Sequence, residues 1–297
     1  MRRAWLLITA VLAAVAILAA GSSTFVYEPV ALPDPTITVT TPIPRQKPKP
    51  TFSDSRREAL TRALRDYLDN RPGRLSLSVR DLSTGIAYSY GGNLRTATAS
   101  IVKVDIVMAL LLKAQRRERP LTSTEKALAE RAIKVSDNAA ATALWHAIGG
   151  SAGLASANRE LGLRDTEPGA GGGWGSTTTS AADQVRLLTA LTSPESTLDA
   201  GGRRYVRRLM GDVAPDQAWG VSAAGTEAEV KNGWLPRDVH GGRWTINSIG
   251  IVHDAGHRYL VAALSERNAT MRDGVEAIEH TTETVAEALA QATTTER

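Results

Sequence analysis

The order of apolar and polar residues divides the chain beyond residue 52 into two kinds of stretch. Apolar residues recur every three or four positions in some stretches, which is typical of helices, and alternate with polar residues in others, which is typical of strands. The pattern predicts helices near 54–71, 100–116, 123–134, 138–148, 181–192 and 273–292, and strands near 75–79, 86–90, 229–234, 243–253 and 257–265.

The arrangement of these stretches predicts the fold class. The strands follow one another as hairpins and do not alternate with helices, so we expect an antiparallel sheet. A run of helices separates the second strand from the third. We therefore predict an α+β fold, an antiparallel sheet flanked by helices with an all-helical lobe inserted between strands.

Residues 1–24 have the pattern of an export signal or a membrane anchor. Arg2 and Arg3 precede an apolar run over 4–20, and small residues follow over 19–23. This order is typical of a secretory signal peptide, yet the run also reaches the lower length limit of a membrane-spanning helix. Residues 25–27 could extend such an anchor to residues 4–27. Both alternatives predict that the rest of the chain lies outside the cytoplasm, secreted or anchored to the outer face of the membrane.

Residues 25–52 are predicted to form a linker. Prolines are dense between residues 29 and 50, where they remove backbone donors and favour an extended chain. The segment is either a spacer or a stub left by signal cleavage. In both cases the folded domain is expected over 53–297.

Composition excludes several classes of function. The 297 residues contain no cysteine, so disulfides, thiolate metal sites and a cysteine nucleophile are excluded. The net charge is +4, but residues 1–50 alone carry five basic and two acidic residues. The remainder is close to neutral and does not supply the basic face that nucleic-acid binding needs.

Ser100 and Lys103 form the first candidate chemical pair. Residues three apart on a helix share one face, and between residues 101 and 112 only Lys103 and Asp105 are polar. Burial lowers the pKa of a lysine, and a neutral amine beside a serine hydroxyl can act as its base. The alternative is a helix-capping serine and a lysine that reaches solvent.

Two similar patterns have structural explanations. Ser123 and Lys126 repeat the spacing, but they stand in a polar stretch that begins with a capping box at Thr122. The run 149–153 satisfies the G-x-S-x-G pattern, yet it joins two helices, where Ser151 is expected to act as a helix cap.

Two further motifs follow in order along the chain. Ser136-Asp137-Asn138 precedes a predicted helix, and chance alone would rarely produce it in a chain of this composition. Lys231-Asn232-Gly233 ends a predicted strand. Each has a structural alternative, a helix cap for the first and a hairpin turn for the second.

The three motifs together resemble those of the penicillin-recognising serine hydrolases, the class A β-lactamases and penicillin-binding proteins, over about residues 53–297. Asn232 departs from the threonine usual in the third motif. The resemblance implies Ser100 as nucleophile, Lys103 as base or proton relay, and Ser136 as the group that passes a proton to the leaving nitrogen. It further implies substrate contacts from Asn138, Lys231, Asn232 and Gly233, and an oxyanion hole from the N–H groups of Ser100 and Trp234.

Two other residues resemble family positions less closely. Glu167, before Pro168, loosely resembles the glutamate of the R-W-E-P form of the Ω-loop, which is the deacylating base in class A enzymes. The loop here is shorter and rich in glycine, and a surface role is the alternative. Arg243 resembles the strand arginine that supports carboxylate binding, with a solvated strand end as the alternative.

The sequence therefore predicts an exported serine hydrolase that cleaves β-lactams through an acyl-enzyme on Ser100. A D-alanyl-D-alanine carboxypeptidase-like or esterase-like penicillin-binding protein is the enzymatic alternative, and a non-catalytic cell-wall-binding module is the other. We expect a monomer whose partner is a small-molecule β-lactam or a cell-wall peptide, with no nucleic acid, no metal and no organic cofactor.

Overall fold

The computed structural model describes residues 51–170 and 172–294. The predicted signal or anchor over 1–24 and most of the linker over 25–52 lie outside these residues. The elements are α1 (Asp54–Leu68), β1 (Arg74–Asp81), β2 (Ala87–Tyr90), β3 (Thr96–Ala97), η1 (Ala99–Ile101), α2 (Val102–Gln115), α3 (Ser123–Lys134), α4 (Asn138–Ile148), α5 (Gly150–Glu160), η2 (Trp174–Ser176), β4 (Thr178–Thr179), α6 (Ala181–Thr192), α7 (Ala200–Gly211), η3 (Pro215–Gln217), η4 (Val221–Ala224), β5 (Glu227–Arg237), η5 (Asp238–His240), β6 (Arg243–Asp254), β7 (His257–Asn268) and α8 (Met271–Thr294).

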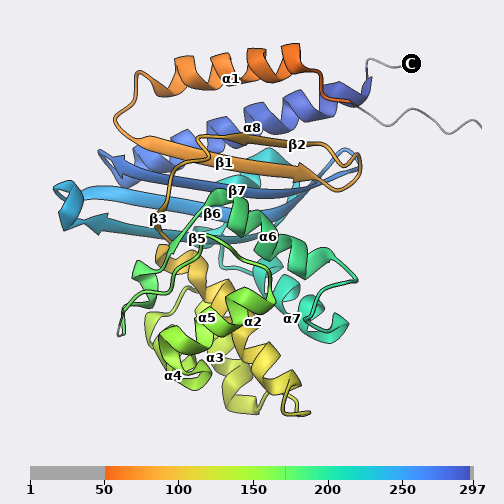
Figure 1. Ribbon diagram of the computed structural model, residues 1–297. Coiled ribbons are helices and arrows are strands. Elements are labelled where there is room, and N and C mark those ends of the chain that lie inside the picture. Colours follow the sequence, from red (N-terminus) through yellow and green to blue (C-terminus); the bar gives the residue numbers. More distant parts are fainter. Residues whose placement is uncertain (1–50, 171, 295–297) are drawn as a thin grey trace, which may run out of the picture. The chain divides into compact units, whose positions relative to one another are not determined.

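One five-stranded sheet organises the fold (Figure 1). Its order is β2-β1-β7-β6-β5, and all neighbouring strands are antiparallel. The helical insert connects β2 to β5, which are the two opposite edges of the sheet. The α+β fold predicted from the sequence is confirmed.

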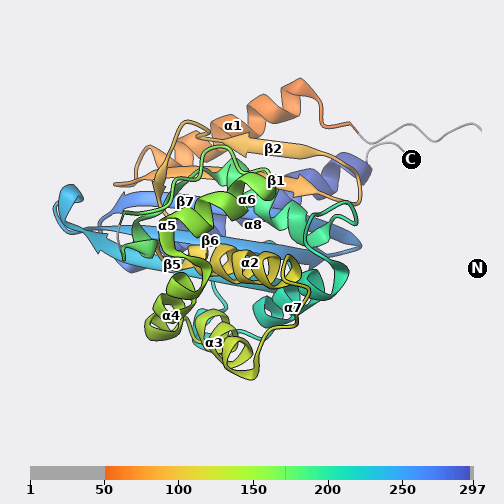
Figure 2. The ribbon, with the colours of Figure 1, turned by 60° about the horizontal axis from the view of Figure 1, so that its bottom comes forward.

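Helices cover both faces of the sheet. In the two ribbon views α1 and α8 lie on one face, and α2 to α7 lie on the other (Figures 1 and 2). The alternation of side chains along β7 supplies both interfaces. Leu260, Ala262 and Leu264 join the core of the insert, whereas Tyr259 and Val261 join the core beneath α1 and α8.

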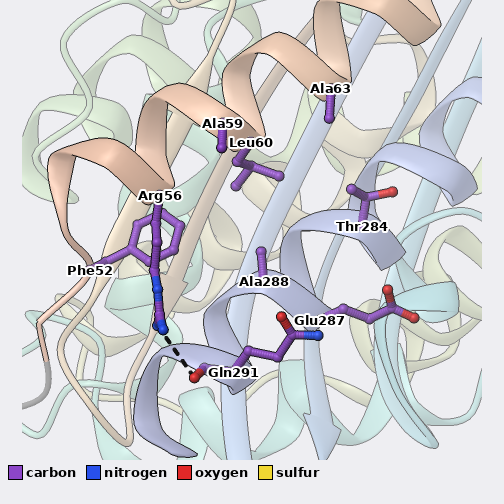
Figure 3. A pocket seen from close by; sticks show the side chains of 9 residues that line it. All are labelled: Phe52, Arg56, Ala59, Leu60, Ala63, Thr284, Glu287, Ala288 and Gln291. Atoms are coloured by element: carbon purple, nitrogen blue, oxygen red, sulfur yellow. Dashed lines mark hydrogen bonds between the residues drawn. The ribbon is translucent and has the colours of Figure 1, made fainter. Parts of the chain in front are cut away.

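Phe52 extends the folded domain into the predicted linker. It is buried, its ring meets the ring of Tyr88 edge-on with centroids 6.3 Å apart, and Arg57 lies 5.2 Å over its face. Figure 3 shows Phe52 in a groove between α1 and α8. The expectation that the core begins only at residue 53 was therefore wrong, because the Phe52 side chain packs between Arg57 of α1 and Tyr88 of β2.

Two local expectations also differ from the structure. Gly149, in the left-handed conformation at φ 99°, is the cap between α4 and α5, and Ser151 lies within α5 and donates to the carbonyl of Gly169 at 2.6 Å. Helix α7 was not predicted, because Gly201 and Gly202 weaken the helical pattern at its start. Packing of its apolar side into the insert core stabilises it.

Across the described ranges 51–170 and 172–294, no helix has both the length and the apolar character needed to cross a membrane.

Candidate active site

Ser100 lies at the point where the sheet meets the helical insert. It stands in η1 and leads directly into α2, and the preceding Ala99 adopts a left-handed φ of 49°. Such a backbone costs a non-glycine residue about 1–3 kcal/mol, so the surrounding contacts must impose it. Ser100 itself is partly exposed.

The edge strand β5 presses against this turn. A Cβ atom on Gly233 would lie 2.6 Å from the Ser100 nitrogen and 2.8 Å from the Thr98 carbonyl oxygen. From the neighbouring strand, Asn247 donates its side-chain amide to the carbonyls of Ala97 and Thr98 at 2.8 and 3.0 Å. The backbone of the turn that carries Ser100 is thus held by two strands, by the close approach of Gly233 and by the Asn247 side chain.

Lys103 is fully buried one turn further along α2. Its amine donates to the carbonyl oxygen and the hydroxyl of Ser136, at 2.5 and 3.0 Å, and to Oδ1 of Asn138 at 2.8 Å. Burial lowers the pKa of Lys103 to about 8, although the negative charge of Asp137 opposes the shift. Within the described residues no hydrogen bond joins this amine to the Ser100 hydroxyl.

Ser136 brings two lysines together. Its backbone is left-handed at φ 56°, and Asp137, not Ser136, caps α4 by accepting from the Ala140 N–H. The Ser136 hydroxyl lies 3.0 Å from the amine of Lys103 and 3.0 Å from that of Lys231. A hydroxyl between two amines is a suitable relay for protons.

Lys231 reaches this hydroxyl from β5 and is buried. Burial lowers its pKa well below the usual value, and repulsion from Lys103 lowers it further. Two amines on one hydroxyl cannot both carry a full charge cheaply in a buried site. The pair therefore favours one ammonium and one neutral amine, and the neutral amine can accept a proton.

Asn232 turns away from this pair. Side chains alternate along a strand, so Asn232 faces the opposite side from Lys231. Its amide donates to the carbonyls of Gln217 and Trp219 at 2.8 and 2.9 Å and so anchors the loop before η4. Trp234, on the same side, is partly exposed and lies 5.8 Å from the Trp219 ring.

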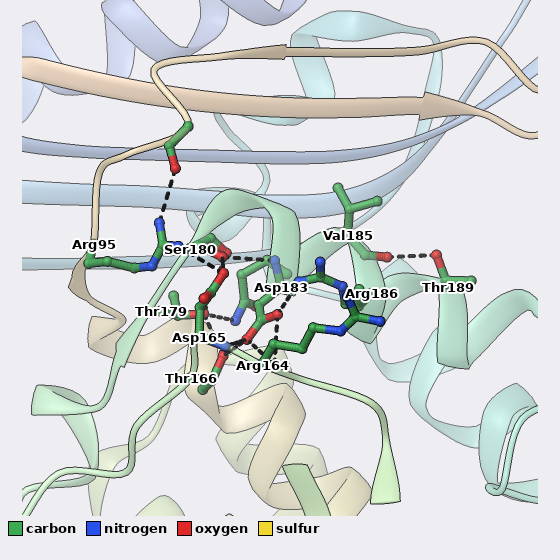
Figure 4. Close-up of polar contacts among 12 residues, drawn as sticks. Arg95, Arg164, Asp165, Thr166, Thr179, Ser180, Asp183, Val185, Arg186 and Thr189 are labelled. Carbon is green, nitrogen blue, oxygen red and sulfur yellow. Dashed lines mark hydrogen bonds and ion pairs between the residues drawn. The ribbon is translucent and has the colours of Figure 1, made fainter. Parts of the chain in front are cut away.

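Glu167 is exposed on the loop after α5. Its backbone pairs with that of Thr178, and its side chain has no hydrogen bond or ion pair within the described part of the chain. The loop itself is anchored below, because the buried Asp183 accepts from the N–H groups of Arg164 and Asp165 and from the Thr166 hydroxyl (Figure 4).

A second buried carboxyl lies on the helix that carries Lys103. Asp105 accepts from the side-chain amide of Asn158, with the amide oriented so that its nitrogen lies 2.9 and 3.0 Å from the carboxyl oxygens. Burial raises the pKa of Asp105 to about 8, the charge of Asp183 adds to the shift, and the Asn158 hydrogen bond opposes it. This carboxyl therefore holds its proton at neutral pH.

Trp174 was not assigned to the site from the sequence. Its ring lies 5.0 Å from the Lys103 amine, measured to the ring centroid, and its N–H donates to the Thr142 hydroxyl at 3.1 Å. A tryptophan in a glycine-rich loop has no periodic pattern to place it. The only signal was its position just before a run of threonines.

Arg243 lies away from the lysine pair. It pairs with Arg237 in the β5–β6 ladder, whereas Lys231 pairs with Ile249, six residues further along β6. At about 3.3 Å per residue that separation is about 20 Å. Arg243 is exposed and donates to the Arg267 carbonyl at 3.3 Å, so the structure does not bring it to Ser100.

A sequence model of the Beta-lactamase enzyme family matches residues 59–125 and 118–292. The chain belongs to this family. The family predicted from the three motifs is therefore confirmed.

Curated relatives of this β-lactamase-family chain come from mycobacteria. Proteins of Mycobacterium tuberculosis and Mycobacterium bovis named "Putative lipoprotein LppW" are 30% identical over 192 residues. The match covers 60% of this chain and 59% of theirs, so it spans about three-fifths of the length of these relatives.

Solved structures show the same β-lactamase fold. The TLA-1 extended-spectrum β-lactamase superimposes with a TM-score of 0.70 at 15% identity, covering 78% of this chain and 98% of that one. A class A β-lactamase from Bacteroides cellulosilyticus gives 0.68 at 15%, covering 80% and 99%, and PBP-A gives 0.68 at 20%, covering 78% and 96%. At these identities the likeness concerns the fold alone.

Proposed function

We propose that the protein is an exported serine hydrolase that is acylated on Ser100 by β-lactams and related amides. The observation that carries the proposal is the placement of the Ser136 hydroxyl between two buried amines, Lys103 and Lys231, beside the turn that presents Ser100. A non-catalytic module has no need to bury two lysines on one hydroxyl, since unpaired buried charge is destabilising.

The proposed reaction begins with attack of the Ser100 oxygen on the substrate carbonyl carbon. The hydroxyl proton passes to neutral Lys103, which must first turn from its present acceptors. From there Ser136 relays a proton to the leaving nitrogen as the amide bond breaks. The oxyanion would accept from the N–H groups of Ser100 and Trp234. Water then attacks the ester, releases the acid and restores the serine.

Substrate contacts in this proposal come from Asn138 and Lys231. Asn138 is exposed beside the amine of Lys103 and could meet a substrate amide. Lys231 could attract a substrate carboxylate when it is the charged member of the lysine pair, which leaves Lys103 neutral. Asn232 would act indirectly, because its side chain anchors a loop. The proposal gives Arg243 no contact with the substrate.

A second candidate is a penicillin-binding protein that acylates quickly and deacylates slowly. The observation that favours it is Glu167, which is exposed and whose side chain makes no hydrogen bond or ion pair within the described residues. A water molecule needs a base to attack the ester efficiently, and this carboxylate is not held in place as one. β-Lactam hydrolysis requires Glu167 or another base to reach the ester after substrate binds.

Intact mass spectrometry of the protein mixed with excess penicillin distinguishes these functions. A transient adduct with steady hydrolysis indicates a β-lactamase, and a lasting adduct indicates a penicillin-binding protein. Ser100→Ala should abolish the adduct, whereas Ser123→Ala, in the second S-x-x-K copy, should leave it unchanged. An adduct that persists in Ser100→Ala would refute the assignment of Ser100 as the nucleophile.

The base can be tested in the same assay. Lys103→Ala should abolish acylation while the fold is retained, and Lys126→Ala is the matched control. Unchanged acylation in Lys103→Ala would refute the lysine as base.

Export is part of the proposal. It rests on the basic and apolar pattern of residues 2–23, and the lipoprotein name of the mycobacterial relatives agrees with it. This chain has no cysteine, so a lipid attached through cysteine is not available to it. Cell fractionation with and without residues 1–24 tests the location, and a cytoplasmic full-length protein would contradict it.

A further inference from the structure

Trp174 closes one side of the Lys103 amine. An ammonium group has three donors, and the three nearest acceptors, the carbonyl and hydroxyl of Ser136 and Oδ1 of Asn138, can take all of them. The indole ring is a further neighbour, 5.0 Å away. Lys103 is consequently 0% exposed although Asn138 faces solvent.

The ring is held from both ends. Its N–H donates to Thr142 on α4. Its backbone belongs to η2, which is followed directly by Thr177. The Thr177 carbonyl accepts from the Thr98 N–H at 2.7 Å, next to the turn that carries Ser100. Gly169 fixes the start of the loop by donating to the Thr177 hydroxyl at 3.1 Å. The contact with Lys103 is thus part of the site's framework.

We propose that Trp174 is a positioning residue whose ring face holds the Lys103 ammonium against Ser136 and Asn138 and whose bulk closes the loop side of the amine to water. The kinetic part of this inference rests on the proposed function. Hydrolysis needs a water oxygen to attack the ester carbonyl, one water proton to pass to a base and another proton to return to the Ser100 oxygen as the ester bond breaks. With the loop side covered by the ring, we expect water to reach the ester more slowly and the acyl group to last longer than it would without Trp174.

Two opposing effects act on the charge of Lys103. The π face of an indole favours an ammonium over it, whereas the apolar bulk of the same ring disfavours charge by excluding water. The other charged groups near this amine are Asp137 on the α4 side and Lys231 on β5. Trp174→Phe keeps the π face, and Trp174→Leu keeps the apolar bulk but removes the π face.

The first experiment follows the charge of Lys103 directly. NMR titration of its ε-methylene group in Trp174→Leu should give a midpoint about half a pH unit lower than in Trp174→Phe. Trp244→Leu removes a partly buried tryptophan on the other face of the sheet and should leave the midpoint unchanged. Equal midpoints in the Leu and Phe variants would overturn the positioning role, whether or not the protein is acylated.

The second experiment measures the lifetime of the penicilloyl adduct by intact mass. Trp174→Ala should shorten it at least tenfold, and Trp174→Phe should shorten it less. An unchanged or longer lifetime in Trp174→Ala would overturn the barrier to water. If no variant and no wild-type protein forms an adduct, the proposed function fails, and the titration alone decides the role of Trp174.

Discussion

The close approach of β5 to the serine turn gives a quantitative prediction for Gly233→Ala. The added methyl group would lie 2.6 Å from the Ser100 nitrogen, 2.8 Å from the Ile101 nitrogen and 2.8 Å from the Thr98 oxygen, whereas ordinary contacts begin at 3.4 Å. All three atoms are backbone. The two segments must therefore separate by about 0.6–0.8 Å, which is an overpacking change of about 1–3 kcal/mol.

Catalysis should suffer more than stability. A shift of this size moves the Ser100 oxygen and its N–H group relative to the oxyanion, and a misplacement near 1 Å can cost about a hundredfold in rate. We expect Gly233→Ala to lower the acylation rate by about a hundredfold, measured with a fluorescent penicillin, while urea denaturation shows a folded protein.

Gly92→Ala is the matched control, because a Cβ there meets no atom within 4 Å and its backbone needs no left-handed φ. It should alter neither rate nor stability. Acylation by Gly233→Ala at the wild-type rate would refute the argument that this contact positions Ser100.

Protonation and the support beneath Ser100 give three more expected outcomes. Burial lowers the pKa of Lys103 to about 8, and only the neutral amine accepts a proton. The acylation rate should therefore increase as the pH rises towards 8. A rate that does not change with pH would contradict Lys103 as the base. The pKa of Asp105 is about 8 when folded and 3.8 when unfolded. The folded state therefore binds more protons in this window, and the free energy of unfolding should fall with rising pH by up to about 1.4 kcal/mol per unit. Asp105→Asn should remove this slope in urea titrations, and an unchanged slope would exclude the residue as its source. Asn247→Ala removes the amide donor from the carbonyls of Ala97 and Thr98, of which the Thr98 carbonyl keeps the Ile101 N–H at 3.3 Å. The loss should cost about 1–3 kcal/mol by urea denaturation, chiefly through the Ala97 carbonyl. A change within error would show that other groups satisfy it.

Periodicity and composition were sufficient for much of the framework. The apolar run around Lys103 predicted a buried lysine, and the structure buries it completely. The hairpin order of the strands predicted the antiparallel sheet with an insert. Such signals succeed because burial on one or both faces restricts which residues a helix or strand can carry.

Side-chain direction and strand register were harder to predict. The alternation along β5 does indicate that Asn232 and Lys231 face opposite ways. The resemblance of the motif nevertheless implied that both residues contact the substrate. The distance of Arg243 from the lysine pair depends on the register of the β5–β6 hairpin, and so on how far β5 continues past the motif. Because β5 continues to Arg237, Arg243 pairs at the far end of the hairpin. Trp174 lies in an irregular loop, where contact partners depend on tertiary packing alone.

The connection between opposite edges of the sheet has a consequence for the folding kinetics. Ser100 and Lys231 are about 130 residues apart in the chain, and β5 meets the serine turn only when the whole insert has closed. Pairing across such distances is slow compared with helix formation. During refolding, helical circular dichroism should therefore recover before penicillin labelling does, and the labelling amplitude should report the final docking of the edge strand.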